Sequence, residues 1–270
     1  MKKKKSELTM QEQFVENHRN EHRQISSCRV LLLVAFLVIW EVCADTGIID
    51  SFFFSSPSRV VLNFITLWKE QSLLTHISIT LFETIISFSL VFLISLITAT
   101  ALWYSEKLSR ILEPYLVLLN SLPKSALAPL FIVWLGTGID TIIVAGVSVA
   151  LFGSIISFYT GFSQVDTEKL TLIRTLGGTK KDMFFKVVLP GSIPILLSTT
   201  KVNIGLALVG VIIGEFLAAR RGLGYLIIYG SQVFQLNMVI TSVLLLCIIA
   251  FGFYSGIQYI EHRMRKTTSL

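Results

Sequence analysis

Cysteine and charge are both scarce in this chain. Among its 270 residues there are three cysteines, Cys28, Cys43 and Cys247, with no CxxC pair and no cluster with histidine. The sequence therefore indicates neither a disulfide framework nor a zinc site. Charged residues make up 15 % of the chain and hydrophobic residues 53 %. That balance favours a membrane protein with several spans over a water-soluble protein of one or two domains.

The motifs of nucleotide hydrolysis and of metal-dependent catalysis are also missing. The stretch Gly177-Gly178-Thr179-Lys180 mimics a phosphate-binding loop only superficially, because the G-x-x-x-x-G-K-[ST] spacing is absent. The four histidines form no H-E-x-x-H pair and lie in tails or near the ends of spans: His18, His22, His76 and His262. We therefore predict no catalytic residue, no metal site and no bound cofactor, which makes an intramembrane enzyme the least favoured function.

A net charge of +6 raises nucleic-acid binding as an alternative, but no aromatic platform is interleaved with the basic residues. These residues collect between apolar segments, as they do in cytoplasmic loops. Seventeen Lys or Arg fall in the segments that we expect on the cytoplasmic side, against four on the outer side, while Lys124 and Lys201 lie within spans. This asymmetry supports a membrane topology.

Long runs without charge predict an all-α polytopic membrane protein with six transmembrane helices. About 20 residues at 1.5 Å each cross a hydrocarbon core of about 30 Å. The expected spans are 30–49, 77–103, 115–135, 139–162, 192–217 and 238–260. They form a transmembrane domain of residues 30–262, between a basic tail over 1–29 and a short tail over 263–270. Both termini are expected in the cytoplasm.

Three further features refine this topology. A cleaved signal peptide is an alternative for the first span, because Val42-Cys43-Ala44 resembles a cleavage site, but an n-region of 29 residues is long and several spans follow. After Ser56-Pro57, apolar residues at helical spacing predict an amphipathic helix on the outer membrane surface. A second short outer element is expected around Gly222-Leu223-Gly224-Tyr225.

The segment from Asp166 to Pro194 is charged and lies between the fourth and fifth spans. Gly177 permits a tight turn between two short helices, and Pro190 marks the start of the next helix. The pattern predicts a helix-turn-helix outside the bilayer. A charge run of this kind is, taken alone, more often a solvated connection between helices.

This segment resembles the cytoplasmic coupling loop of binding-protein-dependent ABC importer permeases. The resemblance rests on Arg174-Thr175-Leu176-Gly177 and on Val187-Val188-Leu189-Pro190. The E-A-A of the family's signature is replaced by Thr171-Leu172-Ile173, and Glu168 stands one turn earlier. The resemblance implies an ATPase-coupling role for eight residues: Glu168, Thr171, Leu172, Ile173, Arg174, Gly177, Leu189 and Pro190.

Other motifs over about residues 30 to 262 resemble the subfamily for sulfonates, taurine, nitrate and thiamine precursors. They are Trp40-Glu41, Ser55-Ser56-Pro57-Ser58, Ala128-Pro129-Leu130-Phe131, Gly136-Thr137-Gly138, Gly214-Glu215-Phe216 and Gly222-Leu223-Gly224. The resemblance implies a multi-pass permease of a bacterial plasma membrane, working as a homodimer with two cytoplasmic ATPases and an extracytoplasmic solute-binding protein. ATP would be hydrolysed by the partner, and the solute would be a sulfonate, nitrate or a nitrogenous vitamin precursor.

Ionisable residues within spans are costly and need a reason. We expect Glu83 and Lys201 to lie near helix ends and Glu215 to pair with Arg220 or Arg221, which are structural roles. Lys124, between Pro123 and Pro129, is a candidate for the lining of the pathway, although a lysine satisfied by carbonyl groups in a kinked helix explains it equally well. Asn120 and Asn203 are further lining candidates, with hydrogen bonds between helices as the alternative.

A secondary transporter or channel that works alone is the competing function. Such a protein is expected to show a charged relay deep in facing helices or an inverted internal repeat. Neither is evident in this sequence, and the charged segment of residues 166–194 favours a chain driven by a partner.

Overall fold

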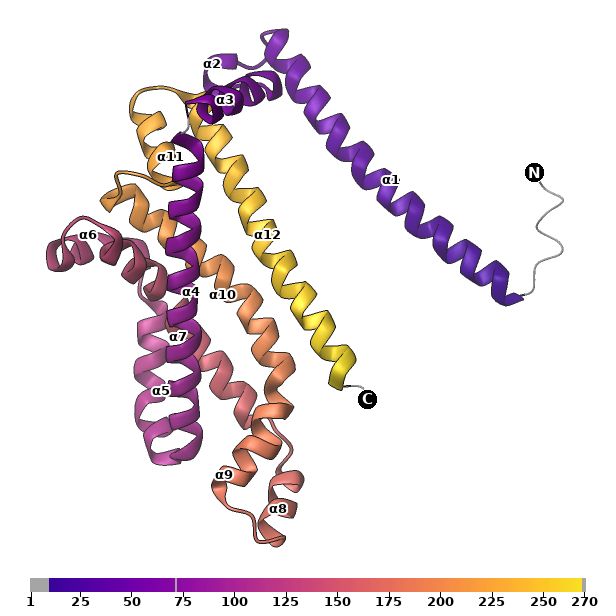
Figure 1. Ribbon diagram of the computed structural model, residues 1–270, viewed down its shortest axis with the longest axis vertical. Coiled ribbons are helices and arrows are strands. Elements are labelled where there is room, and N and C mark those ends of the chain that lie inside the picture. Colours follow the sequence, from indigo (N-terminus) through magenta and orange to yellow (C-terminus); the bar gives the residue numbers. More distant parts are fainter. Residues whose placement is uncertain (1–9, 71, 269–270) are drawn as a thin grey trace. The chain divides into compact units, whose positions relative to one another are not determined.

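The computed structural model describes residues 10–70 and 72–268, which are almost entirely helical and contain no strand (Figure 1). The chain divides into two compact units, residues 1–63 and residues 64–270. Five described helices are long and apolar enough to cross a membrane, or six if one bent pair counts as a single span. The predicted all-α polytopic fold is confirmed. The Lys2 to Lys5 part of the basic tail lies outside the described residues.

In the first unit, helix α1 (Met10–Asp45) carries a candidate span over Gln24–Asp45, and is followed by α2 (Ser51–Phe54) and by the start of α3 (Pro57–Lys69). The first two motifs of the subfamily meet here. Glu41 of α1 accepts hydrogen bonds from the Ser58 backbone N–H at 2.9 Å and from the Ser58 hydroxyl at 2.7 Å. A carboxylate is favourable at this position because the first N–H groups of α3 have no partner within the helix.

The second unit is built on three long helices, α4 (Ser72–Tyr104), α7 (Ile139–Ser163) and α10 (Leu189–Ala218). Glycines let α7 and α10 approach each other closely. A Cβ atom on Gly210 of α10 would lie 2.8 Å from the Ala145 carbonyl oxygen and 2.8 Å from the Gly146 Cα of α7. Small residues take this role between membrane helices because van der Waals packing drives their association.

The third predicted span, 115–135, is a bent pair of helices. Helix α5 (Glu106–Ser121) and helix α6 (Lys124–Leu135) are separated by a break and differ in direction by 94°. Pro123 explains the break, since proline has no N–H and disfavours a helical conformation at the residue before it. Leu122 is accordingly extended, with φ −63° and ψ 139°. Helix α5 begins at Glu106, nine residues before the start of the predicted span, and Ser105 caps it at the Leu108 N–H.

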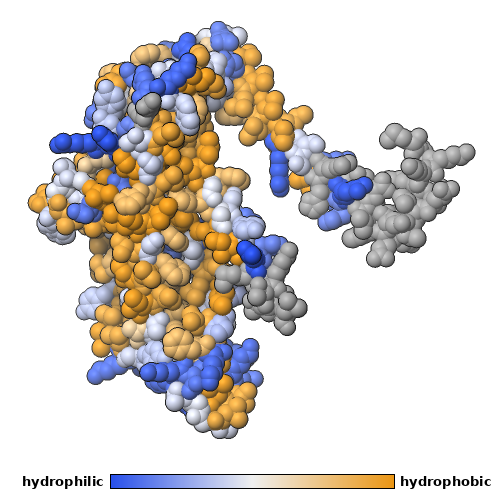
Figure 2. Space-filling view, viewed as in Figure 1, coloured by the Kyte–Doolittle hydropathy of each residue, from blue (hydrophilic) through white to orange (hydrophobic). Residues whose placement is uncertain are grey.

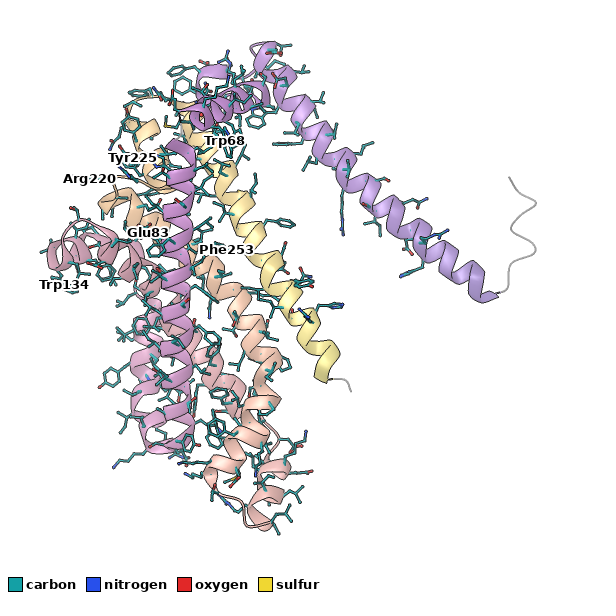
Figure 3. The ribbon with its side chains drawn as sticks, in the orientation of Figure 1. Trp68, Glu83, Trp134, Arg220, Tyr225 and Phe253 are labelled. Atoms are coloured by element: carbon teal, nitrogen blue, oxygen red, sulfur yellow. The ribbon has the colours of Figure 1, made fainter. Side chains whose placement is uncertain are left out.

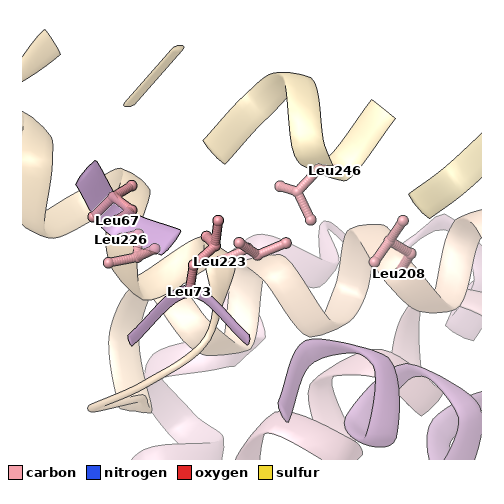
Figure 4. Packing of buried hydrophobic residues seen from close by; sticks show 6 residues of the cluster. All are labelled: Leu67, Leu73, Leu208, Leu223, Leu226 and Leu246. Atoms are coloured by element: carbon pink, nitrogen blue, oxygen red, sulfur yellow. The ribbon is translucent and has the colours of Figure 1, made fainter. Parts of the chain in front are cut away.

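The predicted short element before the sixth span is helix α11 (Leu223–Gln232), and α12 (Leu236–Thr268) follows it. A cluster of buried leucines packs α11 against its neighbours (Figure 4). Its members come from α3, α4, α10, α11 and α12: Leu67, Leu73, Leu208, Leu223, Leu226 and Leu246. This cluster holds α11 in place at one end of the second unit.

Candidate functional site

The candidate coupling loop lies at the end of α10 opposite to α11 (Figure 1). It comprises α8 (Thr167–Thr175), α9 (Lys180–Met183) and a π-helical turn, Phe184–Val188, that runs into α10. Hydrophilic residues gather at this end of the second unit, whereas apolar residues cover the middle of its helices (Figure 2). The predicted helix-turn-helix is therefore present, and α10 begins at Leu189, next to the predicted Pro190.

Gly177 makes the turn between α8 and α9. Its φ is +81°, a left-handed conformation that side chains other than glycine rarely adopt. The Gly177 N–H donates to the Arg174 carbonyl at 3.0 Å, and the next N–H, of Gly178, donates to Ile173 at 2.9 Å. A Cβ on Gly177 would meet no atom within 4 Å. The requirement for glycine is thus one of backbone conformation and not of space.

A capping box starts α9. The Thr179 hydroxyl accepts from the Asp182 N–H at 3.3 Å, while the Asp182 carboxylate accepts from the Thr179 N–H at 3.0 Å. Lys186 pairs with the same carboxylate at 2.7 Å. The capping box satisfies the N–H groups of Thr179 and Asp182, which would otherwise be unpaired at the start of this very short helix.

We expect Thr179→Ala to loosen α9, because loss of an N-cap side chain costs about 1 kcal/mol. Amide hydrogen exchange over residues 180–188 should become about fivefold faster, as about 1 kcal/mol implies when exchange follows local opening. Thr175→Ala is the matched control, since the Thr175 hydroxyl donates only within α8, to the Thr171 carbonyl at 2.9 Å. Equal exchange in the two variants would show that the capping box does not hold α9.

The eight predicted coupling residues divide into two groups. Most of those on α8 and at the turn face solvent, with Leu172 59 % exposed, and Ile173 is half-buried. At the start of α10, Leu189 instead packs into the helix bundle, whereas Pro190 is exposed. Two exposed apolar residues of the loop were not predicted, Leu176, which is 75 % exposed, and Phe185. Their exposure could not be inferred from the sequence, because the turn at Gly177 and the π-helical turn decide which way they point.

The inner side of the loop is joined to the bundle by aromatic packing. Phe184 is buried and lies 5.3 Å from the ring of Trp103 in α4 and 5.4 Å from that of Phe162 in α7. The Lys180 ammonium also donates to the Tyr104 carbonyl at 3.4 Å. A close-packed interior has few voids that could absorb a displacement, so it transmits the displacement to its neighbours. A force on the loop would therefore reach α4, α7 and α10 together.

The three predicted lining residues come from three helices, Asn120 from α5, Lys124 from the start of α6 and Asn203 from α10. The Lys124 ammonium donates to the Leu119 carbonyl and lies 5.2 Å from the Phe152 ring centre, while Asn120, nearby on α5, is exposed. Asn203 lies on α10, is 3 % exposed, and its buried Nδ2 has no hydrogen-bond partner. Within residues 10–70 and 72–268, no hydrogen bond joins Asn203 to either of the other two.

Two expected positions of ionisable residues are wrong. Glu83 does not lie at a helix end but is buried within α4, 2 % exposed (Figure 3). Lys201 lies in the middle of α10, where it forms an ion pair with Glu261 of α12 and stands 5.9 Å from the Tyr254 ring centre. Glu261, a partner on another helix that the sequence does not identify, makes the position of Lys201 tolerable.

The expected pairing of Glu215 with arginine is also wrong. Glu215 is fully buried and accepts a hydrogen bond from the Thr80 hydroxyl of α4 at 2.6 Å. Arg220 and Arg221 are exposed. In the described part of the chain neither forms an ion pair with Glu215.

Comparisons with known proteins agree on one family. Residues 91–266 match the family model "Binding-protein-dependent transport system inner membrane component". A Haemophilus influenzae protein named "Probable ABC transporter permease protein" is 30 % identical, over 87 % of this chain and 95 % of the relative. The formylaminopyrimidine transport permease protein ThiX of Halalkalibacterium halodurans is 29 % identical over 72 % of this chain and 77 % of its own length. The taurine transport system permease protein TauC of Escherichia coli is 23 % identical over 86 % of each chain.

Solved structures support the same fold. A chain of the MetNI methionine ABC transporter in an inward-facing conformation aligns with a TM-score of 0.63 and 21 % identity, covering 70 % of this chain and 94 % of that one. The family model spans the candidate coupling loop and the helices α7, α10 and α12. The chain belongs to the inner membrane components of binding-protein-dependent transport systems, the permeases of ABC importers.

Proposed function

We propose that this chain forms the translocation pathway of an ABC importer and is driven by a separate cytoplasmic ATPase that docks on the α8–α9 loop. The observation that carries this proposal is the loop's outer surface, where apolar side chains stand in solvent beside basic ones. Leu172, Leu176 and Phe185 are exposed, and Arg174 and Lys181 lie among them in the sequence. Exposed apolar groups rimmed by charge are typical of an interface with another protein.

The remaining partners follow from this assignment. The pathway of the proposed importer is formed with a second copy of the chain, and an extracytoplasmic binding protein delivers the solute to the outer side. The loop and both termini lie in the cytoplasm, in a multi-pass protein of a bacterial plasma membrane. ATP is bound and hydrolysed by the partner, and the chain itself contributes movement of its helices.

The proposed solute is a small sulfonate, nitrate or a nitrogenous vitamin precursor. Support comes from relatives named for the transport of taurine and of formylaminopyrimidine. Asn120, Lys124 and Asn203 are the proposed lining residues. Of these, Asn203 has a buried amide nitrogen without a hydrogen-bond partner, as expected of a group that binds a ligand or water.

The test is purification of the tagged chain from its native membranes in mild detergent, followed by mass spectrometry of the proteins that accompany it. An ATPase that co-purifies supports the proposal, and a binding protein found with it narrows the solute. A chain that emerges alone in several detergents and transports solute in liposomes without ATP would instead establish the secondary carrier.

We expect Leu176→Glu to reduce retention of the ATPase at least about fivefold, since full burial of a leucine side chain is worth about 1.5–3 kcal/mol. Thr167→Glu is the matched control, because it adds the same charge to α8 at an exposed position of the first turn, where an acidic residue is favourable. Equal retention in both variants would place the ATPase elsewhere.

A further inference from the structure

The first turn of α11 has an unusual source of hydrogen-bond acceptors. Its N-cap residue, Gly222, has no side chain, so the first N–H groups of the helix need partners from elsewhere. The Leu223 N–H donates to the Thr80 hydroxyl oxygen of α4 at 2.8 Å. The Gly224 N–H donates to the carboxyl group of Glu215, near the end of α10. A side chain from the preceding helix therefore caps α11.

The two glycines of the motif at α11 explain how the carboxyl group comes so close. A Cβ atom on Gly222 would overlap the Glu215 carboxyl group, and one on Gly224 would lie 2.7 Å from Glu215 Oε2. Neither glycine could be replaced without displacing the acid. The Gly214-Glu215-Phe216 and Gly222-Leu223-Gly224 motifs thus form one structural unit, although six residues lie between Glu215 and Gly222 in the sequence.

These hydrogen bonds favour an ionised Glu215. The Thr80 oxygen accepts from Leu223, so its single hydrogen is free to be donated to Glu215 Oε1, 2.6 Å away. Glu215 Oε2 accepts from the Gly224 N–H. In this arrangement each carboxyl oxygen accepts a hydrogen bond, which suits an ionised carboxylate. The positive end of the α11 dipole also favours a negative charge at this point.

Glu83 is the second acid of this site. It lies on the same face of α4 as Thr80, is buried, and its carboxyl group contacts that of Glu215. Glu83 Oε2 has no hydrogen-bond partner, so a charge on this group would be uncompensated. Two adjacent buried carboxylates cannot both stay ionised. No Lys or Arg of the described ranges forms an ion pair with either acid.

We infer that Glu215 is a buried carboxylate that positions α11 on α4, and that Glu83 is its proton-bearing neighbour, whose O–H group donates to Glu215. The pair holds one proton and one negative charge. Glu215 is a positioning residue, since it holds the backbone of α11 and has no assigned contact with a solute. If the proposed function holds, α10 links the coupling loop at one end to the Glu83–Glu215 pair at the other.

The proton assignment predicts opposite outcomes for two conservative variants. Glu83→Gln replaces the O–H donor by an N–H donor of nearly the same shape, so α11 should remain in place. Glu215→Gln puts an NH₂ group against N–H and O–H donors, so at least one hydrogen bond to a charged acceptor is lost. Amide exchange over residues 223–232 in the full chain in lipid nanodiscs should become at least about tenfold faster in Glu215→Gln and stay unchanged in Glu83→Gln.

Each other result of this comparison would overturn the inference. Faster exchange in Glu83→Gln alone would place the proton on Glu215, faster exchange in both would exclude a neutral donor at Glu83, and no change in either would show that the pair does not hold α11. Glu106→Gln, on the exposed part of α5, is the control for loss of a carboxylate.

Infrared spectroscopy provides a second readout that does not depend on Glu215→Gln folding. The wild-type chain should show the C=O stretch of a protonated buried carboxyl group, and Glu83→Gln should lose that band. Its absence in the wild type, or its persistence in Glu83→Gln, would refute the assignment. Neither measurement requires transport or an ATPase, so its failure would leave the proposed function untouched.

Discussion

Gly177→Val is expected to abolish solute transport while the ATPase partner continues to hydrolyse ATP. Gly177 has a φ of +81°, and no atom lies within 4 Å of a Cβ built on it. A valine would therefore fit sterically into open space but would strain the backbone by about 1–2 kcal/mol, and by more because it is β-branched. The turn would relax towards another conformation and change how α8 is presented. Solute transport and ATP hydrolysis are measured together on the reconstituted complex of the chain with its ATPase partner.

Gly177→Asn is the matched variant for this prediction, since asparagine adopts the left-handed conformation far more readily than valine. It should retain transport, and membrane insertion should be normal in both variants. Wild-type transport in Gly177→Val would defeat the argument that the turn's conformation matters for coupling. Loss in both variants would point to the side chain's presence at the interface instead.

Gly210→Val is expected to prevent α7 and α10 from packing. The atoms that an added Cβ would meet at 2.8 Å are backbone atoms, the Ala145 oxygen and the Gly146 Cα. Backbone atoms cannot move aside by a change of rotamer, so the helices must separate. Overpacking of this kind costs typically 1–3 kcal/mol and occasionally more, and we expect about 3 kcal/mol here. Thermal unfolding in detergent, with the monodisperse fraction by gel filtration, measures the loss.

Gly205→Ala on the same helix is the control, because nothing lies within 4 Å of its added Cβ. It should be neutral or slightly stabilising, since alanine is a better helix former than glycine. If Gly210→Val unfolds at the same temperature as Gly205→Ala, the close approach of α7 and α10 does not contribute to stability.

The sequence predicted helices well wherever a local pattern of residues decides the structure. Long charge-free runs located α4, α7, α10 and α12, and the Ser56-Pro57 pair located α3, which begins at Pro57. The turn at Gly177 followed from a glycine between two charged segments. The inner location of both termini stays a prediction, as does the coupling role of the α8–α9 loop.

The polar contacts within the membrane were predicted poorly, for a physical reason. Glu215 is held by Thr80, and Lys201 by Glu261, residues far away in the chain and brought close only by packing. Proximity in sequence suggested Arg220 and Arg221 as partners of Glu215, but α11 turns its first N–H groups towards the acid instead. The N-terminus of a helix carries a partial positive charge, which cannot be recognised from the charged residues of the sequence.

The contact between Lys124 and the Leu119 carbonyl has a consequence for any charge-selectivity experiment. In a continuous helix, the N–H of residue 123 would donate to the carbonyl of residue 119. Pro123 has no N–H, and the Lys124 ammonium takes the place of that donor. The lysine side chain thus supplies the hydrogen-bond donor that the backbone lacks at the bend. Lys124→Met would leave a carbonyl without its donor at membrane depth, so its loss of transport would report a collapsed bend as readily as a lost attraction for anions.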